Sequence, residues 1–236
     1  MKQLKFGLLG VTAIFSSLLT MAQTADEIIA KHIEALGGKD KINAVKTVVT
    51  DGAVSIMGND APNKTYLING KGYKNELDFN GQKIVQVFTD KGGWAINPMG
   101  GGTDPVPMPE DQYKNGKAQI NVGGPLFDYQ AKGYKVELQG KEGNLHKLKV
   151  TTEGGEQTLL IDPTTYYITK QISKGEAQGQ SVEITTTFTN YKKTEFGLVV
   201  PYNIDIDLGG FTIGAAITKV EVNKEVDPKI FDMPGK

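Results

Sequence analysis

Two segments in the last quarter of the chain alternate apolar and polar residues one by one. One is 182–189 and the other is 203–208. A period of two places successive side chains on opposite faces of a β-strand. The pattern is typical of an antiparallel sheet with one covered face and one face in water. The covered faces would carry Val182, Ile184, Thr186 and Phe188 in the first segment and Ile204, Ile206 and Leu208 in the second.

The rest of the chain contains many more segments with strand character. Asn69-Gly70 and Asn80-Gly81 are hairpin signals, because both residue types tolerate positive φ. The Gly- and Pro-rich segment 99–111 is expected to be a loop. The expected strands are 48–57, 64–69, 73–79, 83–89, 94–97, 134–139, 145–151, 157–162, 167–173, 182–191, 199–208 and 211–222.

A helix is expected to begin at Thr24. The Thr24 side chain can accept a hydrogen bond from the amide of Glu27 while Glu27 reaches back, which forms a capping box. Apolar residues follow at helical spacing, and Gly37-Gly38 allows the left-handed turn that ends a helix. Shorter helices are expected at 40–45, 109–114 and 126–132.

This arrangement of elements predicts the class of fold. A chain with so many strands and so few short helices cannot form a doubly wound fold. No repeat or long linker divides it, so residues 23–236 are expected to form a single domain. We predict a mainly β fold: one large curved antiparallel sheet with short helices covering its concave face. Whether the helices fill that face or leave a cavity for an apolar ligand is open at this point.

The first 22 residues have the organisation of an export signal. Lys2 and Lys5 precede a short apolar run, residues 6–19, and Ala22 supplies a small residue at the expected cleavage position. The run is shorter than the ~20 residues that a spanning helix needs, so we expect cleavage rather than a membrane anchor. The mature chain would begin near Gln23. It has no cysteine to carry a lipid, so we expect an exported, soluble protein without a lipid tether.

The residue composition limits the classes of molecule that the protein could bind. The chain has no cysteine and no arginine, so a core without disulfides must hold it together. Loss of Lys2 and Lys5 leaves 24 of the 26 basic residues against 27 acidic ones, a formal net charge of about −3. The absence of a basic block argues against nucleic acid as a partner. The absence of arginine removes the side chain best suited to bidentate recognition of phosphate or carboxylate.

The residue patterns of common catalytic and metal sites are absent. The two histidines, His32 and His146, are not in a metal-binding spacing, and no cysteine could complete a zinc site. No serine lies in a G-x-S-x-G turn. Asp205 and Asp207 are expected on the wet face of a strand. We therefore predict no enzyme activity, no metal and no cofactor.

The only tryptophan, Trp94, lies in the stretch VFTDKGGWAINPMGGG, residues 87–102. It stands between a diglycine and an Asn-Pro turn. Two interpretations are open: Trp94 is an ordinary core residue at the start of a strand, or it forms part of the wall of a ligand site.

The order of these parts resembles the periplasmic outer-membrane lipoprotein-sorting proteins, the LolA/LolB-like family. A signal peptide leads into one amphipathic helix and then paired hairpins. The stretch VFTDKGGWAINP is similar to the family's apolar strand, turn, aromatic strand and Asn-Pro end. The later hairpins at 145–149, 159–162 and 168–172 and the closing VDPKIFDMP are also similar. The segments PVPMPE and GPLFDY resemble a Bacteroidota branch of the family.

The resemblance implies an unclosed half-barrel with a helical lid over a hydrophobic cavity that holds lipoprotein acyl chains. Trp94 would face the concave side. The partners would be lipid or lipoprotein acyl chains and an acceptor or donor protein of the outer or inner membrane. The family's carriers have an arginine that helps to hold the lid closed, and this chain has no arginine. The resemblance is therefore a better guide to the fold of this chain than to its cargo. The residues of cavity and lid would be Ile29, Ile33, Leu36, Phe88, Trp94, Ile96, Leu126 and Phe127.

Three functions are compatible with these features. The leading hypothesis is a periplasmic carrier or binding protein for lipoprotein acyl chains or another lipid. The alternative is a non-catalytic structural or interaction domain in envelope assembly, with a filled core and a sheet edge that accepts a partner strand. The third is an enzyme, or the remnant of a domain that accompanies a peptidase, which would require a cleft with perturbed carboxylates.

Overall fold

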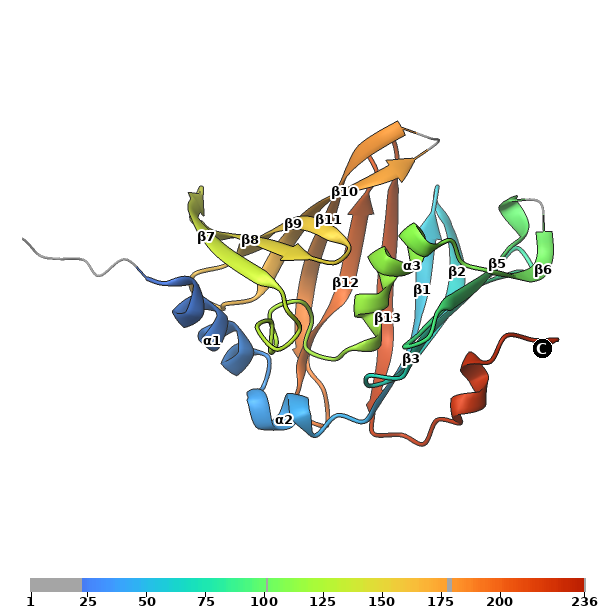
Figure 1. Cartoon of the computed structure of the whole chain (residues 1–236), viewed down its shortest axis with the longest axis horizontal. Helices are drawn as coiled ribbons and strands as arrows, with labels where there is room; N and C mark the ends of the chain where they lie inside the picture. The colour runs from blue at the N-terminus through green and yellow to red at the C-terminus, as the bar shows by residue number, and fades with distance from the viewer. Residues whose placement is uncertain (1–22, 101, 178–179, 236) are drawn as a thin grey trace, which may run out of the picture.

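A single open β-sheet organises the molecule. The computed structural model describes residues 23–100, 102–177 and 180–235, so the expected signal peptide at 1–22 lies outside the described residues. In the described part, 13 strands form one antiparallel sheet in the order β6-β5-β4-β3-β2-β1-β13-β12-β11-β10-β9-β8-β7. Figure 1 shows the sheet curving around a hollow side, with β6 and β7 at its two unpaired ends. The predicted fold class is confirmed.

Each predicted strand segment overlaps an observed strand, although β2 and β10 extend beyond their predicted bounds, and one strand is additional. Segment 99–111, expected as a loop, contains β6, so that prediction is wrong. Pro105 and Pro107 lack the N–H that a central strand must donate, but an edge strand with one neighbour tolerates them. The strands are β1 Thr47–Ile56, β2 Asn59–Ile68, β3 Gly72–Phe79, β4 Gln82–Thr89, β5 Gly93–Asn97, β6 Gly102–Pro107, β7 Lys135–Glu142, β8 Leu145–Thr152, β9 Gly155–Ile161, β10 Ile168–Ala177, β11 Gln180–Lys193, β12 Val199–Asp207 and β13 Thr212–Val222.

The helices are short, and the first begins as predicted. The amide of Glu27 donates to the Thr24 hydroxyl (3.2 Å), and the Thr24 amide donates to the Glu27 carboxylate (3.1 Å). The helix expected at 126–132 is absent, because the left-handed φ of 47° at Asp128 cannot continue a right-handed helix. The helices are α1 Ala25–Ala35, α2 Lys39–Asn43 and α3 Glu110–Gly116, with 3-10 turns η1 Pro98–Gly100, η2 Lys117–Ile120 and η3 Pro228–Phe231.

A β-bulge interrupts the pairing of β1 with β13. The register shifts between Asp51 and Gly52, and a bulge of this kind bends a strand and increases its twist. A Cβ atom on Gly52 would overlap the carbonyl oxygen of Ala216 on β13. Glycine at this position therefore lets the two strands approach each other at the bulge.

The register of β3, β4 and β5 assigns side chains to the two faces of the sheet. Directly opposed residues of an antiparallel pair point to the same face. Tyr73 and Phe88 are opposed, and a Cβ atom on Gly116 of α3 would overlap the Phe88 ring. Because α3 lies on the hollow side (Figure 1), Phe88 is on the concave face. Trp94 is opposed to Val87, one residue out of phase, and lies on the outer face.

The C-terminal segment covers this outer face. Phe231 of η3 packs in a cluster with Val85, Val87 and Trp94, and the Trp94 indole N–H donates to the Phe231 carbonyl at 2.8 Å. Figure 1 shows η3 on the side of β3 away from α3. Ile96 packs against the same cluster. The prediction that Trp94 faces the concave side is therefore wrong. The small residues Gly93 and Ala95 of β5 share the face of Phe88 and Gln86.

Replacement of Phe231 should show how much its contact with the outer face contributes to the stability of the fold. We expect Phe231→Ala to lower the free energy of unfolding by about 3–5 kcal/mol, the usual loss for a buried phenylalanine, since its side chain is 6% exposed. Urea unfolding followed by the fluorescence of the single tryptophan measures it. The control, Phe211→Ala, removes a ring that is 38% exposed. Equal losses in the two variants would contradict the assignment.

Candidate functional site: the concave face of the sheet

The middle of the concave face carries rows of apolar side chains that remain partly exposed. One row runs from β1 to β11 through Val54, Ala215, Ile204 and Phe188. The next row contains Ile56, Ile213 and Ile206. These side chains are half-buried rather than buried. Apolar surface that stays accessible over several strands is typical of a binding surface.

One end of the concave face is filled by α1. Ile28 and Ile29 of α1 pack against Leu148 of β8 and Leu159 of β9, and Leu126 joins the same cluster. Figure 1 shows α1 beside β7 and β8. The apolar face of the predicted helix therefore packs against the sheet itself. This end of the concave side is a closed core.

A run of turns at residues 121–133, here called the covering loop, crosses the next part of the concave face. Phe127 packs with Ile42, Val45 and Leu198. The Lys132 ammonium donates to the Gly124 carbonyl at 3.0 Å and lies 5.9 Å from the centre of the Phe127 ring. Burial lowers the pKa of Lys132, and Asp128 offsets part of the effect. Lys132 thus holds the loop together from within.

A small cavity lies between the sheet, η2 and the covering loop. Its volume is about 180 Å³. A cavity of roughly 150 Å³ can hold a molecule the size of benzene, so this one has room for a short piece of a hydrocarbon chain. Its apolar walls include Val48, Leu67, Val122, Leu198, Val200, Val220 and Val222, and its polar lining residues are Thr65, Tyr73, Gln119 and Thr194.

Two asparagines fasten the segments that cover the cavity. Asn69, in the β2–β3 turn, donates to the Val45 carbonyl (3.2 Å) and accepts from the Val122 amide (3.1 Å). It therefore joins the α2–β1 connection to the covering loop. Asn223 accepts from the Lys46 amide (2.7 Å) and donates to the Ala44 carbonyl (3.1 Å). In a chain without arginine, these side-chain amides make hydrogen bonds to the backbone of the covering segments.

The two histidines of the chain meet at one tyrosine. Nδ1 of His32, on α1, hydrogen-bonds to the Tyr166 carbonyl at 2.7 Å. The ring of His146, on β8, stacks on the Tyr166 ring with centroids 6.2 Å apart. The Tyr166 hydroxyl accepts from the Lys31 ammonium at 3.1 Å. Tyr166 has a left-handed φ of 57°. This group of residues, the His–Tyr latch, ties α1 to the β9–β10 turn.

Both histidines of the latch are held in their neutral form. Burial lowers the pKa of His32, and its hydrogen bond to the Tyr166 carbonyl offsets part of that effect. Burial is also the main cause of the lowered pKa of His146. Lys141 and Lys31 lower this pKa further, while Asp162 raises it. Nε2 of His146 is buried and has no hydrogen-bond partner among the described residues. A proton on either ring would therefore weaken the docking of α1.

Six of the eight predicted site residues lie on the concave side, in different roles. Ile29 and Leu126 belong to the core under α1, and Phe127 belongs to the core under the covering loop. Ile33 and Leu36 pack against these clusters while remaining partly exposed. Phe88 is buried beneath α3. Trp94 and Ile96 lie on the outer face, as described above.

Residues of the cavity wall that the sequence did not single out come from segments far apart in the chain. Val220 and Val222 are on β13, whereas Tyr73 is on β3. The alternation in 199–208 indicated which side chains share a face, but not which strands lie beneath the covering loop. Only the pairing of β1 with β13 brings these residues together.

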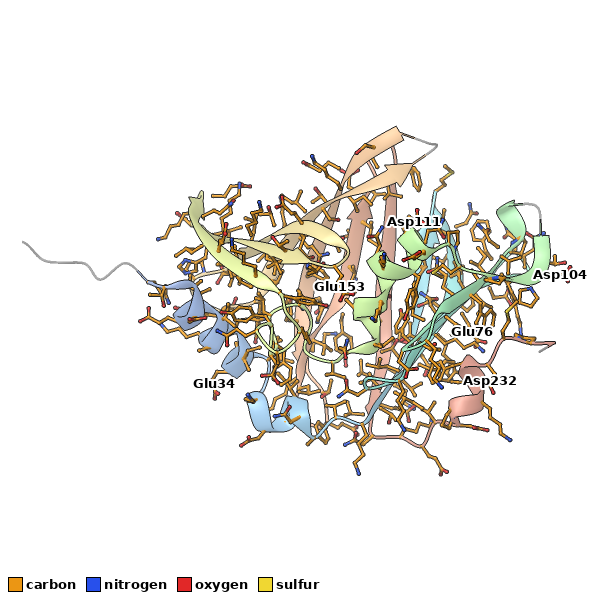
Figure 2. The ribbon with its side chains drawn as sticks, in the orientation of Figure 1. Glu34, Glu76, Asp104, Asp111, Glu153 and Asp232 are labelled. Atoms are coloured by element: carbon orange, nitrogen blue, oxygen red, sulfur yellow. The ribbon has the colours of Figure 1, made fainter. Side chains whose placement is uncertain are left out.

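The described part of the chain carries no cluster of metal-binding side chains. No group of three or more His, Asp or Glu side chains there could hold a metal ion. The acidic side chains labelled in Figure 2 lie on separate elements, from α1 to the segment after η3, and do not converge. None of the described helices is long and apolar enough to cross a membrane.

Comparison with known proteins identifies the fold. No protein-family model matches the sequence, and no curated protein is similar to it. A LolA superfamily protein from Nitrosomonas europaea matches in structure with a TM-score of 0.59 at 12% identity, over 89% of this chain and 98% of that one. A putative outer membrane lipoprotein-sorting protein domain from Vibrio parahaemolyticus matches with a TM-score of 0.57 at 13% identity, over 86% and 95%.

The chain has the LolA/LolB-like fold. Both matches cover nearly the whole of the described chain, which agrees with the resemblance seen in the sequence. The Bacteroidota branch remains a prediction from two short segments.

The His–Tyr latch predicts a loss of stability in weak acid. Each folded-state histidine pKa lies below the unfolded value of 6.5, so the native state binds fewer protons. The contribution of the neutral histidines to the free energy of unfolding is therefore fully present above pH 6.5. It falls as the pH drops toward the folded-state pKa values, by at most about 1.4 kcal/mol per pH unit for each histidine. Urea unfolding between pH 7.5 and 5.0 measures this.

A double variant serves as the control. Asn at position 32 can still donate to the Tyr166 carbonyl, and Phe at position 146 keeps a ring against Tyr166. We expect the variant His32→Asn/His146→Phe to lose most of the pH dependence between 6.5 and 5.0. An unchanged slope would mean that other groups titrate in this range.

Proposed function

We propose that this protein is a periplasmic carrier or binding protein for lipoprotein acyl chains or another lipid. The observation that carries the proposal is the continuous, half-exposed apolar surface on β1, β13, β12 and β11, which adjoins a cavity walled mainly by apolar side chains. The LolA/LolB-like fold supports it. Removal of residues 1–22 as a signal peptide would deliver the chain to the periplasm.

The size of the cavity limits how a lipid could bind. Burial of a sixteen-carbon chain would contribute on the order of 10 kcal/mol at ~0.8 kcal/mol per CH₂. A cavity of about 180 Å³ holds only part of such a chain. The remainder would lie along the apolar rows of Ile204 and Ile206, or the covering loop would move outward. In either case the cargo stays partly accessible, which suits a protein that must release it.

The lid in this proposal consists of α1 and the covering loop. Ile33 of α1 and Leu36, which caps the C-terminus of α1, pack against Phe127 or its neighbours while remaining partly exposed. Ile29 and Leu126 are more deeply buried and anchor the lid to the sheet. Polar substitutions at Ile33 should therefore affect lipid retention more selectively than those at Ile29, which would also unfold the core.

The partners in this proposal are lipid or lipoprotein acyl chains and a donor or acceptor protein at either membrane. No catalytic step is part of it. The edge strand β6 contains Pro105 and Pro107, which cannot donate to an added strand. This edge therefore gives no support to the alternative of a domain that pairs with a partner strand.

The first test is native mass spectrometry of the mature chain, exported to a Gram-negative periplasm and purified without detergent. We expect an added mass that organic solvent removes and that lipid analysis identifies. A bare protein that also fails to take up a fluorescent fatty acid would contradict the proposal. Such a result would favour a structural domain with a filled core.

Two substitutions on one strand test the location of the bound lipid. Ile204→Ser on the concave face should weaken uptake of a fluorescent fatty acid about tenfold, because it removes roughly two CH₂ equivalents of contact at ~0.8 kcal/mol each. The matched control is Asp205→Ser, which lies one residue further along β12 on the opposite face. Equal binding by both variants would place the lipid elsewhere.

A further inference from the structure

The charged side chains of β1–β4 all lie on the outer face of the sheet. Glu76 on β3 is out of phase with Tyr73 of the concave face, and the ladder opposes it to Lys64. Lys64 is in turn opposed to Asp51 and pairs with it at 3.1 Å, while Lys74 pairs with Glu76 at 2.8 Å. The charged residues of these four strands are Asp51, Asp60, Lys64, Lys74, Glu76, Asp78 and Lys83. The charges of this half of the sheet therefore face away from the concave side.

The concave face of the same strands carries uncharged polar side chains instead. Asn75 lies two residues along β3 from Tyr73, so both point to the concave face. The ladders oppose Asn75 to Thr65 on β2 and to Gln86 on β4, and Thr65 also lines the cavity. The group, here called the polar patch, consists of Thr50, Asn63, Thr65, Asn75 and Gln86. It begins beside the cavity and crosses four strands.

Hydrogen bonds fix the polar patch without using all of its capacity. The Thr50 and Thr65 hydroxyls bond to each other, which uses one of their two protons. The Asn63 side-chain nitrogen donates to the Asn75 side-chain oxygen (2.7 Å) and to the Glu76 carbonyl (3.1 Å). These bonds engage neither the Asn63 oxygen nor the Asn75 N–H groups. The patch therefore presents both donors and acceptors to the concave side.

A hollow between the sheet and α3 lies at the far end of the polar patch. Gln86 lines it together with Ala95 of β5 and Gln112 of α3. Among the described residues that line this hollow, Asp104 alone is charged, and it is acidic. The patch thus lies between the cavity and this hollow. A lipid with its acyl chain in the cavity would place its head group on the patch.

The lysines of the elements that cover this side are next to carboxylates. The Lys114 ammonium of α3 lies 2.7 Å from the Glu110 carboxylate. The Lys117 ammonium of η2 lies 3.9 Å from the carboxylate of Glu153, which is in the β8–β9 turn. With Asp111 of α3, these covering segments carry no net positive charge toward the concave side.

We infer that the bound lipid carries an uncharged head group that both donates and accepts hydrogen bonds, and that the polar patch favours it over an anionic phospholipid head. The inference rests on the proposed lipid-binding function and names the class of lipid. Hydroxyl and amide side chains can each donate and accept, and a few placed polar groups usually orient a ligand in an apolar site. A phosphate on this half-buried surface would meet no cation of β1–β4, and a desolvated charge without a partner costs much free energy.

The test compares four ligands with the same acyl chain on the mature, delipidated protein, by displacement of the fluorescent probe N-phenyl-1-naphthylamine. Two have uncharged hydrogen-bonding heads: 1-dodecanoylglycerol and N-dodecanoylglycinamide. Methyl dodecanoate has no donor, and 1-dodecanoylglycerol 3-phosphate adds an anionic group. We expect one of the first two to bind about fivefold more tightly than the methyl ester, the effect of one net hydrogen bond, and about tenfold more tightly than the phosphate. The tighter of the two distinguishes a glyceride from an acylated peptide.

The variant Asn75→Leu keeps the volume of the side chain and removes its amide. It should abolish the preference over methyl dodecanoate and leave the affinity for methyl dodecanoate unchanged. The matched control is Asn203→Leu on β12, which replaces a half-buried asparagine beside Ile204 on the opposite face. This control should retain the preference.

A second pair of variants tests the selection by charge. Gln86→Lys adds a cation to the polar patch at an exposed position, and it should raise the affinity for 1-dodecanoylglycerol 3-phosphate about fivefold. Asp78→Asn changes the net charge by the same amount on the outer face of β3. At about 0.15 M salt, which screens charges beyond roughly 8 Å, it should leave that affinity unchanged.

Three results would overturn the inference. Equal binding of all four ligands by the unmodified protein would refute head-group recognition while leaving lipid binding in place, and this comparison needs no variant to fold. Binding of the phosphate as tightly as 1-dodecanoylglycerol would refute the selection by charge. A preference that persists in Asn75→Leu would assign the recognition to another group. If none of the four ligands displaces the probe, the proposed function fails and the inference fails with it.

Discussion

The pairing of β1 with β13 is the contact on which the rest of the structure depends. The two strands lie at opposite ends of the described chain and pair from Val48–Val222 to Ile56–Ile213. Without this seam, β1–β6 and β7–β13 would be two separate meanders, each with an additional open edge. Contacts between residues so distant in sequence require the closure of a very long loop before they contribute any stability. The seam also contains the bulge beside Gly52.

The cavity lies across this seam. Val48, Leu67 and Tyr73 come from the N-terminal half of the sheet, and Leu198, Val200 and Val220 come from the C-terminal half. Asn223, directly after β13, bonds to the backbone beside β1. The concave surface is therefore a joint product of both halves. Any movement of the covering loop or α1 would change the space over the concave surface. The hydrogen bonds between the strands would stay intact.

Local sequence signals predicted helices and strands well where the stabilising interactions lie within one element. The capping box of Thr24 and Glu27 and the alternation in 182–189 and 203–208 correspond to α1, β11 and β12. The failures have physical causes. Proline did not exclude β6, because an edge strand needs fewer donors, and Asp128 prevented a helix by taking a left-handed conformation. Trp94 was placed on the wrong face, because η3, a segment far away in the sequence, covers the outer face of β5.

By itself, the sequence determined the class of fold, the start of the first helix and the apolar face of each regular strand, because these follow from the period of side chains along one element. Tertiary structure alone decided that His32 and His146 meet at Tyr166, that Phe231 covers Trp94, and that the Asn63 side chain on β2 hydrogen-bonds to the Asn75 side chain on β3. Each of these contacts joins different strands or helices, and periodicity within one element carries no information about its neighbours. The physical reason is that strand order and register, rather than local propensity, bring these side chains within reach of one another.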